Sequence, residues 1–140
     1  MMKHCGSTAQ SEPKLIGTWR LLRWYNEYPD GDRFYPLGDD ATGYISYTDD
    51  GHVFVHIAAA DRSFFASTDL FGGMAEENTA AMNSHVTYAG TFKQNGATVT
   101  HHVTQASFPN WIGSDQVRHA AREDTMLSLS ASRLKMKGTP

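Results

Sequence analysis

The sequence contains a single cysteine and no long apolar run. Cys5 lies in a polar N-terminal stretch, so an internal disulfide is excluded and a reducing compartment is favoured. The first residues, MMKHCGSTAQSEP, lack the apolar core of a secretory signal, and no later segment is apolar for long enough to span a bilayer. From these absences we expect a soluble, cytoplasmic protein.

Basic clusters and the common catalytic motifs are also missing. The chain has 12 Lys and Arg against 15 Asp and Glu, which gives a net charge of -3, and it has no long basic run. It therefore lacks the electrostatic footprint of a protein that binds nucleic acid or an anionic membrane. There is no G-x-S-x-G elbow, P-loop, dinucleotide fingerprint, CxxC or H-E-x-x-H. We accordingly expect no cofactor.

Histidines are frequent, but their spacing does not favour a metal site. His52 and His56 share one face of an expected strand, where four residues of extended chain place them roughly 13 Å apart. His101 and His102 are neighbours in another expected strand and point to opposite sides. No pair has the ligand spacing of a known motif, so we expect no metal.

The composition is that of one folded domain. In 140 residues, 40% are hydrophobic and 11% aromatic, which is enough for one sizeable core. Residues 1–14 are small and polar, and we expect them to form a flexible tail. The domain is then expected to span residues 15–140.

Alternating apolar and polar residues indicate strands joined by tight turns. The clearest example is GYISYTDDGHVFVHIA, a hairpin over Asp-Asp-Gly in which Ile45, Tyr47, Val53 and Val55 take the inward positions. Two further hairpins follow after residue 85, and the only convincing helix is expected at residues 74–84. About eight short strands with one helix covering an end predict an all-β, up-and-down antiparallel barrel.

Several short motifs occur together in a family-specific order. They are LIGTWRL, YPLGDDATGYISYTDDG, YAGTF, THHV and SFPNWIGSDQVR. In this set the chain resembles the lipocalin-like domain family of bacteria and fungi, from Leu15 to about Leu129. The resemblance implies a small barrel with Trp19 packed at its base. It also implies a role in secondary metabolism, where related barrels bind or cyclise hydrophobic intermediates.

The end of the sequence departs from the family pattern. Family members usually continue into one more strand with an aromatic residue and an Arg, whereas this sequence finishes with RLKMKGTP. An absent last strand leaves a seam that the C-terminal tail or another subunit has to cover. We therefore expect a homo-oligomer, a dimer, unless the tail covers the seam.

Two interior residues are candidates for catalysis. His101 lies between Val99 and Val103 on the face expected to line the interior, so its imidazole needs a hydrogen-bond partner there. It is either a satisfied core histidine or an acid–base group. Matching DQVR to the family's Q-x-R implies that Gln116 and Arg118 face inward. A buried guanidinium there would anchor a ligand oxygen or hold a structural network.

Aromatic residues supply the expected walls and lid of a ligand site. The candidate ligand-binding residues are Tyr47, Phe64, Tyr88, Phe92, Asn110, Trp111 and Gln116. Trp111 follows Pro-Asn in a connection between strands, where we expect its indole to close the barrel mouth together with Phe64 or Phe65. The alternative is a core plug enclosed by Phe108 and Ile112.

These features predict that a small, largely apolar molecule with a carbonyl or hydroxyl binds inside the barrel. The leading hypothesis is a cofactor-independent isomerase, dehydratase or cyclase in which His101 moves a proton and Arg118 stabilises oxyanion charge. A carrier or sensor that binds without reaction is the alternative. A module that binds protein partners along an unpaired strand edge is a third class.

Overall fold

The computed structural model describes residues 12–131, whose regular secondary structure is mostly strand. The elements are β1 (Gly17–Arg20), β2 (Asn26–Glu27), β3 (Arg33–Phe34), β4 (Thr42–Tyr47), β5 (His52–Ala58), α1 (Ala75–Asn83), β6 (His85–Asn95), β7 (Thr98–Ala106), the 3-10 turn η1 (Pro109–Trp111), β8 (Asp115–Glu123) and β9 (Met126–Ser130). The sequence-based expectation of an all-β chain with one short helix is confirmed.

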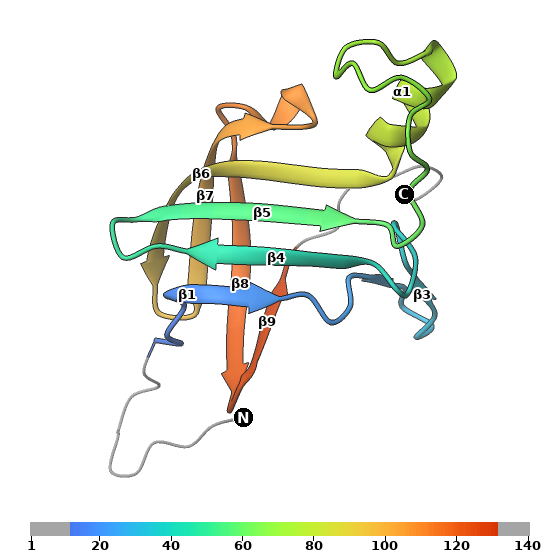
Figure 1. Cartoon of the computed structure of the whole chain (residues 1–140). Helices are drawn as coiled ribbons and strands as arrows, with labels where there is room; N and C mark the ends of the chain where they lie inside the picture. Colours follow the sequence, from blue (N-terminus) through green and yellow to red (C-terminus); the bar gives the residue numbers. More distant parts are fainter. Residues whose placement is uncertain (1–11, 132–140) are drawn as a thin grey trace.

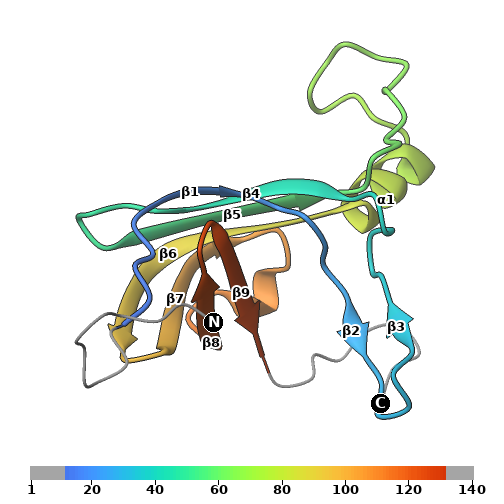
Figure 2. The same cartoon turned by 90° about the horizontal axis from the view of Figure 1, so that it is seen from below.

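Seven of these strands form one antiparallel sheet that curls into a near-closed barrel (Figures 1 and 2). Their order is β1-β4-β5-β6-β7-β8-β9, so from β4 onward every strand pairs with the next large strand in the sequence. Strands β2 and β3 make a separate two-stranded hairpin beside the barrel. The up-and-down order explains why short turns join most of the strands.

The hairpin of β4 and β5 has the expected alternation. Tyr47 pairs with Val53 and Ile45 with Val55, and Tyr47, Val53 and Val55 are buried. Their neighbours Phe54 and His56 are exposed on the outer face. Because side chains alternate across a strand, this register places the apolar set in the interior.

A glycine allows the two longest strands to approach closely. The register between β6 and β7 shifts between Ala89 and Gly90. A Cβ atom at Gly90 would overlap the carbonyl oxygen of His102 on the neighbouring strand. The close backbone packing therefore requires glycine at position 90 of the YAGTF motif. Any larger residue there would push β6 and β7 apart.

The segment before β1 fastens one end of the barrel. Trp19 donates a hydrogen bond from Nε1 to the carbonyl oxygen of Leu15 (2.8 Å), and Arg122 lies over the Trp19 ring at 5.0 Å. Arg122 also donates to the Lys14 carbonyl oxygen (2.9 Å), and Gln94 donates to that of Pro13 (2.7 Å). Of the expected tail at 1–14, only residues 12–14 fall within the described range.

Helix α1 follows a long connection, residues 59–74, that extends away from the barrel (Figures 1 and 2). None of the helical residues is buried. Glu77 accepts hydrogen bonds from the backbone N–H groups of Ala66 (3.0 Å) and Met74 (2.9 Å), which lower the pKa of its carboxyl group. Arg62 donates to the carbonyl oxygen of Ala81 near the other helix end (3.2 Å). These contacts tie the connection to the helix.

The barrel is open between its two outer strands. Within residues 12–131, β1 pairs only with β4 and β9 only with β8. We call the gap between β1 on one side and β8–β9 on the other the seam. The expectation that the C-terminal tail or another subunit covers it falls partly outside the described range, since residues 132–140 are not described. In the same range no helix is long and apolar enough to cross a membrane.

Candidate functional site

Three polar side chains meet inside the barrel. The Tyr47 hydroxyl lies 2.7 Å from Nε2 of His101, and the Tyr88 hydroxyl lies 2.6 Å from Nδ1 of the same ring. The imidazole is thus held at both nitrogens. All three side chains are buried, and His101 is only 1% exposed. We call this group the Tyr-His-Tyr cluster.

The barrel fold brings the cluster together from three strands. Tyr47 ends β4, Tyr88 lies in the first half of β6, and His101 lies on β7, three strands away from β4 in the sheet. The hydrogen bond between Tyr47 and His101 therefore spans the interior rather than following the sheet. Phe92, which pairs with His101 on the neighbouring strand, packs edge-on against Tyr47 with ring centroids 4.8 Å apart.

Burial controls the ionisation of the cluster. Desolvation, followed by the nearby positive charge of Arg118, lowers the pKa of His101 to about 4. Burial also raises the pKa of Tyr47 and Tyr88, while Arg118 acts in the opposite direction on both. At neutral pH the cluster therefore consists of a neutral imidazole and two neutral phenols.

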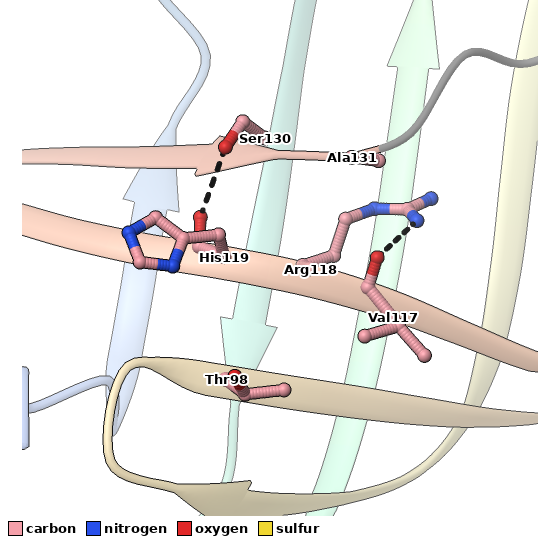
Figure 3. Close-up of a pocket in the computed structure, with 6 residues that line it drawn as sticks. All are labelled: Thr98, Val117, Arg118, His119, Ser130 and Ala131. Carbon is pink, nitrogen blue, oxygen red and sulfur yellow. Dashed lines mark hydrogen bonds between the residues drawn. The ribbon is translucent and has the colours of Figure 1, made fainter.

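The positive charge of Arg118 acts on all three members of this cluster, and the hydrogen-bond partners of Arg118 in the described part of the chain are neutral. It donates to the Val117 carbonyl oxygen (3.1 Å) and to Oε1 of Gln116 (3.3 Å). Figure 3 shows its guanidinium beside the Val117 carbonyl, on the side of β8 where Ala131 lies. The side chain is partly buried and lines a hollow of about 220 Å³. The guanidinium of Arg118 can therefore donate a hydrogen bond to an additional ligand oxygen.

Gln116 and Arg118 both face the interior, as the resemblance implied. Gln116 is 9% exposed, and its register partner on β7 is His101. Its Nε2 donates to Oγ of Ser114 (3.1 Å), while its Oε1 accepts from Arg118. Gln116 thus connects the start of β8 to the guanidinium and holds its orientation.

Trp111 lies at the edge of the cluster. It ends η1, is partly buried, and packs edge-on against Tyr88 with centroids 5.8 Å apart and against Phe108 at 5.6 Å. The indole thus contacts a residue of the cluster. Tyr88 also lines a hollow of about 320 Å³, together with Ala106 and Ser107 among others. The indole ring packs against the hydrophobic core but stays partly exposed, and Phe108 and Ile112 are themselves exposed. The role of Trp111 as a lid stays a prediction.

Two of the expected ligand-binding residues are not brought to the cluster. Phe64 is 98% exposed in the connection before α1, and Asn110 is exposed in η1. Phe65 is also separate, because its ring lies against Gly73 at the start of the helix. The expected contact of Trp111 with Phe64 or Phe65 is therefore absent from this structure. A role for Phe64 or Asn110 in binding stays a prediction.

The sequence did not reveal how the interior residues pair. Alternation placed Tyr47, Tyr88 and His101 on inward faces, but gave no distances across the barrel. It also missed Ala106 and Ser107, which line a hollow together with Tyr88, since small residues carry little chemical signal of their own. Among residues 12–131, no group of three or more His, Cys, Asp or Glu side chains is placed to hold a metal ion.

The fold and the site define a class of protein: a small antiparallel barrel with a few polar groups in an apolar interior, an arrangement typical of small-molecule binding. The sequence model of the lipocalin-like domain family matches residues 16–139, so the chain belongs to that family. Neither a search of curated proteins nor a search of solved structures found a significant match.

Proposed function

We propose that the barrel binds a small, largely apolar molecule that carries a carbonyl or hydroxyl group. The Tyr-His-Tyr cluster is the observation that carries this proposal. A buried polar network contributes little to stability compared with apolar packing of the same shape, and it demands good geometry from every member. Such a network beside an Arg with no carboxylate partner among residues 12–131 is better explained by a ligand oxygen than by stability.

The walls around the cluster fit an apolar ligand. The inward-facing residues near the seam are only partly buried, although they pack against the core: Trp19, Ile45, Leu127 and Leu129. Apolar side chains that face the interior yet keep contact with solvent leave room for an apolar molecule to complete the packing.

A titration with acetophenone, a small aryl ketone, tests this binding. Amide chemical shifts should change at interior positions around His101, Tyr88 and Gln116, and not on the outer faces of the same strands. Arg118→Met should weaken binding about tenfold, because a hydrogen bond from a charged donor is lost. Arg20→Met on exposed β1 is the matched control and should have no effect. Shifts confined to the outer surface would contradict the proposal.

A cofactor-independent isomerase, dehydratase or cyclase is a second candidate. It is supported by the direct hydrogen bonds that join three ionisable groups beside Arg118, an arrangement suited to moving a proton and stabilising an oxyanion. The lowered pKa of His101 favours the carrier or sensor instead, because an imidazole with a pKa of about 4 is a weak base.

Exchange of the methyl protons of acetophenone in D2O separates the two candidates. An enzyme that moves protons next to a carbonyl should accelerate this exchange, and His101→Gln should abolish it in a variant that still binds the ketone. His102→Gln is the matched control, since His102 is exposed on the outer face beside Asp115. A carrier should bind the ketone without any exchange above the buffer rate.

We further propose that a second copy of the chain covers the seam, as expected from the sequence. The unpaired edges of β1 and β9 in the described range support this, because exposed strand edges favour pairing with another chain. Light scattering should then give the mass of a dimer at micromolar concentration. A monomer at every concentration would contradict it.

A further inference from the structure

The hollow of about 320 Å³ lies where the start of β6 meets the end of β7. Tyr88, Ala89 and Ala106 supply its apolar lining. Thr87 and Ala89, which also line it, alternate along β6 with the buried Tyr88 and so lie on the outer face. The hollow can therefore be reached from outside the barrel. It has room for one aromatic ring, since an engineered cavity of about 150 Å³ binds benzene.

The His85 ring, at the start of β6, has one nitrogen engaged and one free. Its Nδ1 lies 2.9 Å from the carbonyl oxygen of Ala81 in helix α1. A carbonyl oxygen only accepts, so Nδ1 carries a hydrogen, and Nε2 of the neutral ring is a bare acceptor. Among residues 12–131, Nε2 has no hydrogen-bond partner. Because no buried side-chain N or O atom in that range lacks a partner, Nε2 is open to solvent.

Two donors line the same hollow. The Ser107 hydroxyl oxygen accepts a hydrogen bond from the Thr87 backbone N–H (3.1 Å), but its own hydrogen has no acceptor in the described part of the chain. The side-chain amide of Gln105 is exposed and also has no partner there. The hollow thus combines an apolar lining with one free acceptor and two free donors.

We propose that this hollow binds a small phenol, whose hydroxyl group donates to Nε2 of His85 and accepts from Ser107 or Gln105. The ring of the phenol packs against Tyr88 and Ala106, and an aromatic pair gains more than the burial of its area. This second site is separate from the interior one, with which it shares only Tyr88. It goes beyond the proposed function and does not depend on it.

The free groups select a hydroxyl over other common polar groups. A ketone or ether oxygen only accepts, so it would leave Nε2 of His85 without a partner. An ammonium group only donates, so it would leave the Ser107 hydrogen without an acceptor. A hydroxyl group does both. The interior site and the hollow should therefore differ in the ligands that they prefer.

Phenol, anisole and toluene test this choice, because they share one ring and differ in the polar group. Phenol donates and accepts, anisole only accepts, and toluene does neither. Phenol added to 15N-labelled protein at pH 8 should shift the amide signals of Thr87, Gln105 and Ser107 and the Nε2 signal of His85. Its affinity should be about fivefold above that of anisole or toluene, because only phenol supplies a hydrogen to Nε2.

His85→Asn isolates the contribution of Nε2. The asparagine amide can replace Nδ1 as the donor to the Ala81 carbonyl, but it carries nothing in place of Nε2. The variant should bind phenol and anisole equally and keep the wild-type affinity for toluene. His102→Asn is the matched control, since His102 is exposed on the outer face of β7 and does not line the hollow. It should keep the preference for phenol.

The outcomes separate this inference from the proposed function. Equal affinities of phenol and anisole for wild-type protein, an unchanged Nε2 signal of His85, or a phenol preference that survives in His85→Asn would each overturn the inference. The first two measurements need no variant, so they decide the question even if His85→Asn does not fold. None of these results bears on acetophenone in the interior. Conversely, a protein that fails to bind acetophenone could still bind phenol at the hollow.

Discussion

Aromatic side chains occupy two contrasting regions of this molecule. In the barrel, Tyr47 and Tyr88 are 1% and 7% exposed and both hydrogen-bond to His101. In the connection at residues 59–74, Phe64 and Phe71 are 98% and 90% exposed. The sequence places aromatic residues in both regions, yet only the first region gives them packing and polar partners.

The difference comes from strand pairing. Each interior tyrosine lies on a strand with neighbours on both sides, so its direction is fixed by the register of the sheet. The exposed phenylalanines lie in a segment whose backbone is held only by local contacts such as those of Glu77 and Arg62. An aromatic residue in a pattern is therefore informative about a site only when the sheet determines where it points.

Stability should show the contrast most strongly. Tyr47→Ala should lower the free energy of unfolding by about 3–5 kcal/mol, because a buried ring and its hydrogen bond to His101 are lost together. Phe71→Ala should change it by less than about 0.5 kcal/mol, as expected for an exposed position. Urea unfolding at pH 7 measures both. A loss of unfolding free energy in Phe71→Ala as large as that in Tyr47→Ala would show that the connection packs against the barrel in solution.

Acid should weaken the interior through His101. Burial lowers its folded-state pKa to about 4, below the 6.5 of the ordinary side chain, so the unfolded chain binds more protons between these values. Stability should therefore be complete above about pH 6.5 and fall as the pH decreases toward 4, by about 3 kcal/mol in total.

Matched histidine variants isolate this contribution from that of the carboxylates. His101→Gln should flatten the pH dependence of urea unfolding between pH 6.5 and 4 relative to wild type. His102→Gln, on the outer face of the same strand, should keep the wild-type slope. If His101→Gln also keeps that slope, the imidazole is not held neutral by burial.

Most of the fold could be predicted from sequence because its signals are local. Alternation placed Tyr47, Val53 and Val55 inside, and the structure confirms each of them. The helix expected at 74–84 is Ala75–Asn83. The family could be recognised because some of its motif residues have a fixed backbone role, such as Gly90 in the middle of β6.

The site was only partly predictable. Its members were found one by one, since His101, Arg118 and Gln116 are polar residues at inward positions. Their arrangement could not be predicted, because Tyr47 and His101 lie on strands three apart in the sheet. Their contact across the interior depends on the curvature of the barrel. The expected contact of Trp111 with Phe64 is absent for a related reason. The composition of a long connection does not determine the direction in which the connection runs.

Trp111 is intermediate in burial between the aromatic residues of the two regions and should show an intermediate effect. Its ring is partly buried against Tyr88 and Phe108, and each aromatic pair contributes about 0.5–1.5 kcal/mol beyond area. Trp111→Ala should therefore destabilise the protein by about 2 kcal/mol and weaken the binding of acetophenone. Wild-type tryptophan fluorescence should shift on binding, and this shift should be absent in the variant. Normal binding by a variant that unfolds readily would assign the indole to the core alone.

The smallest effect is expected at Phe64. The Phe64 side chain is 98% exposed, so Phe64→Ala should leave the free energy of unfolding within about 0.5 kcal/mol of wild type. If the connection keeps the position it has in the structure, the affinity for acetophenone should also be unchanged. A loss of affinity without a loss of stability would show instead that the connection bends over the ligand, as the sequence led us to expect. Phe71→Ala then distinguishes contact through the Phe64 ring from contact through the whole connection. If only the Phe64 ring touches the ligand, Phe71→Ala should keep the wild-type affinity for acetophenone.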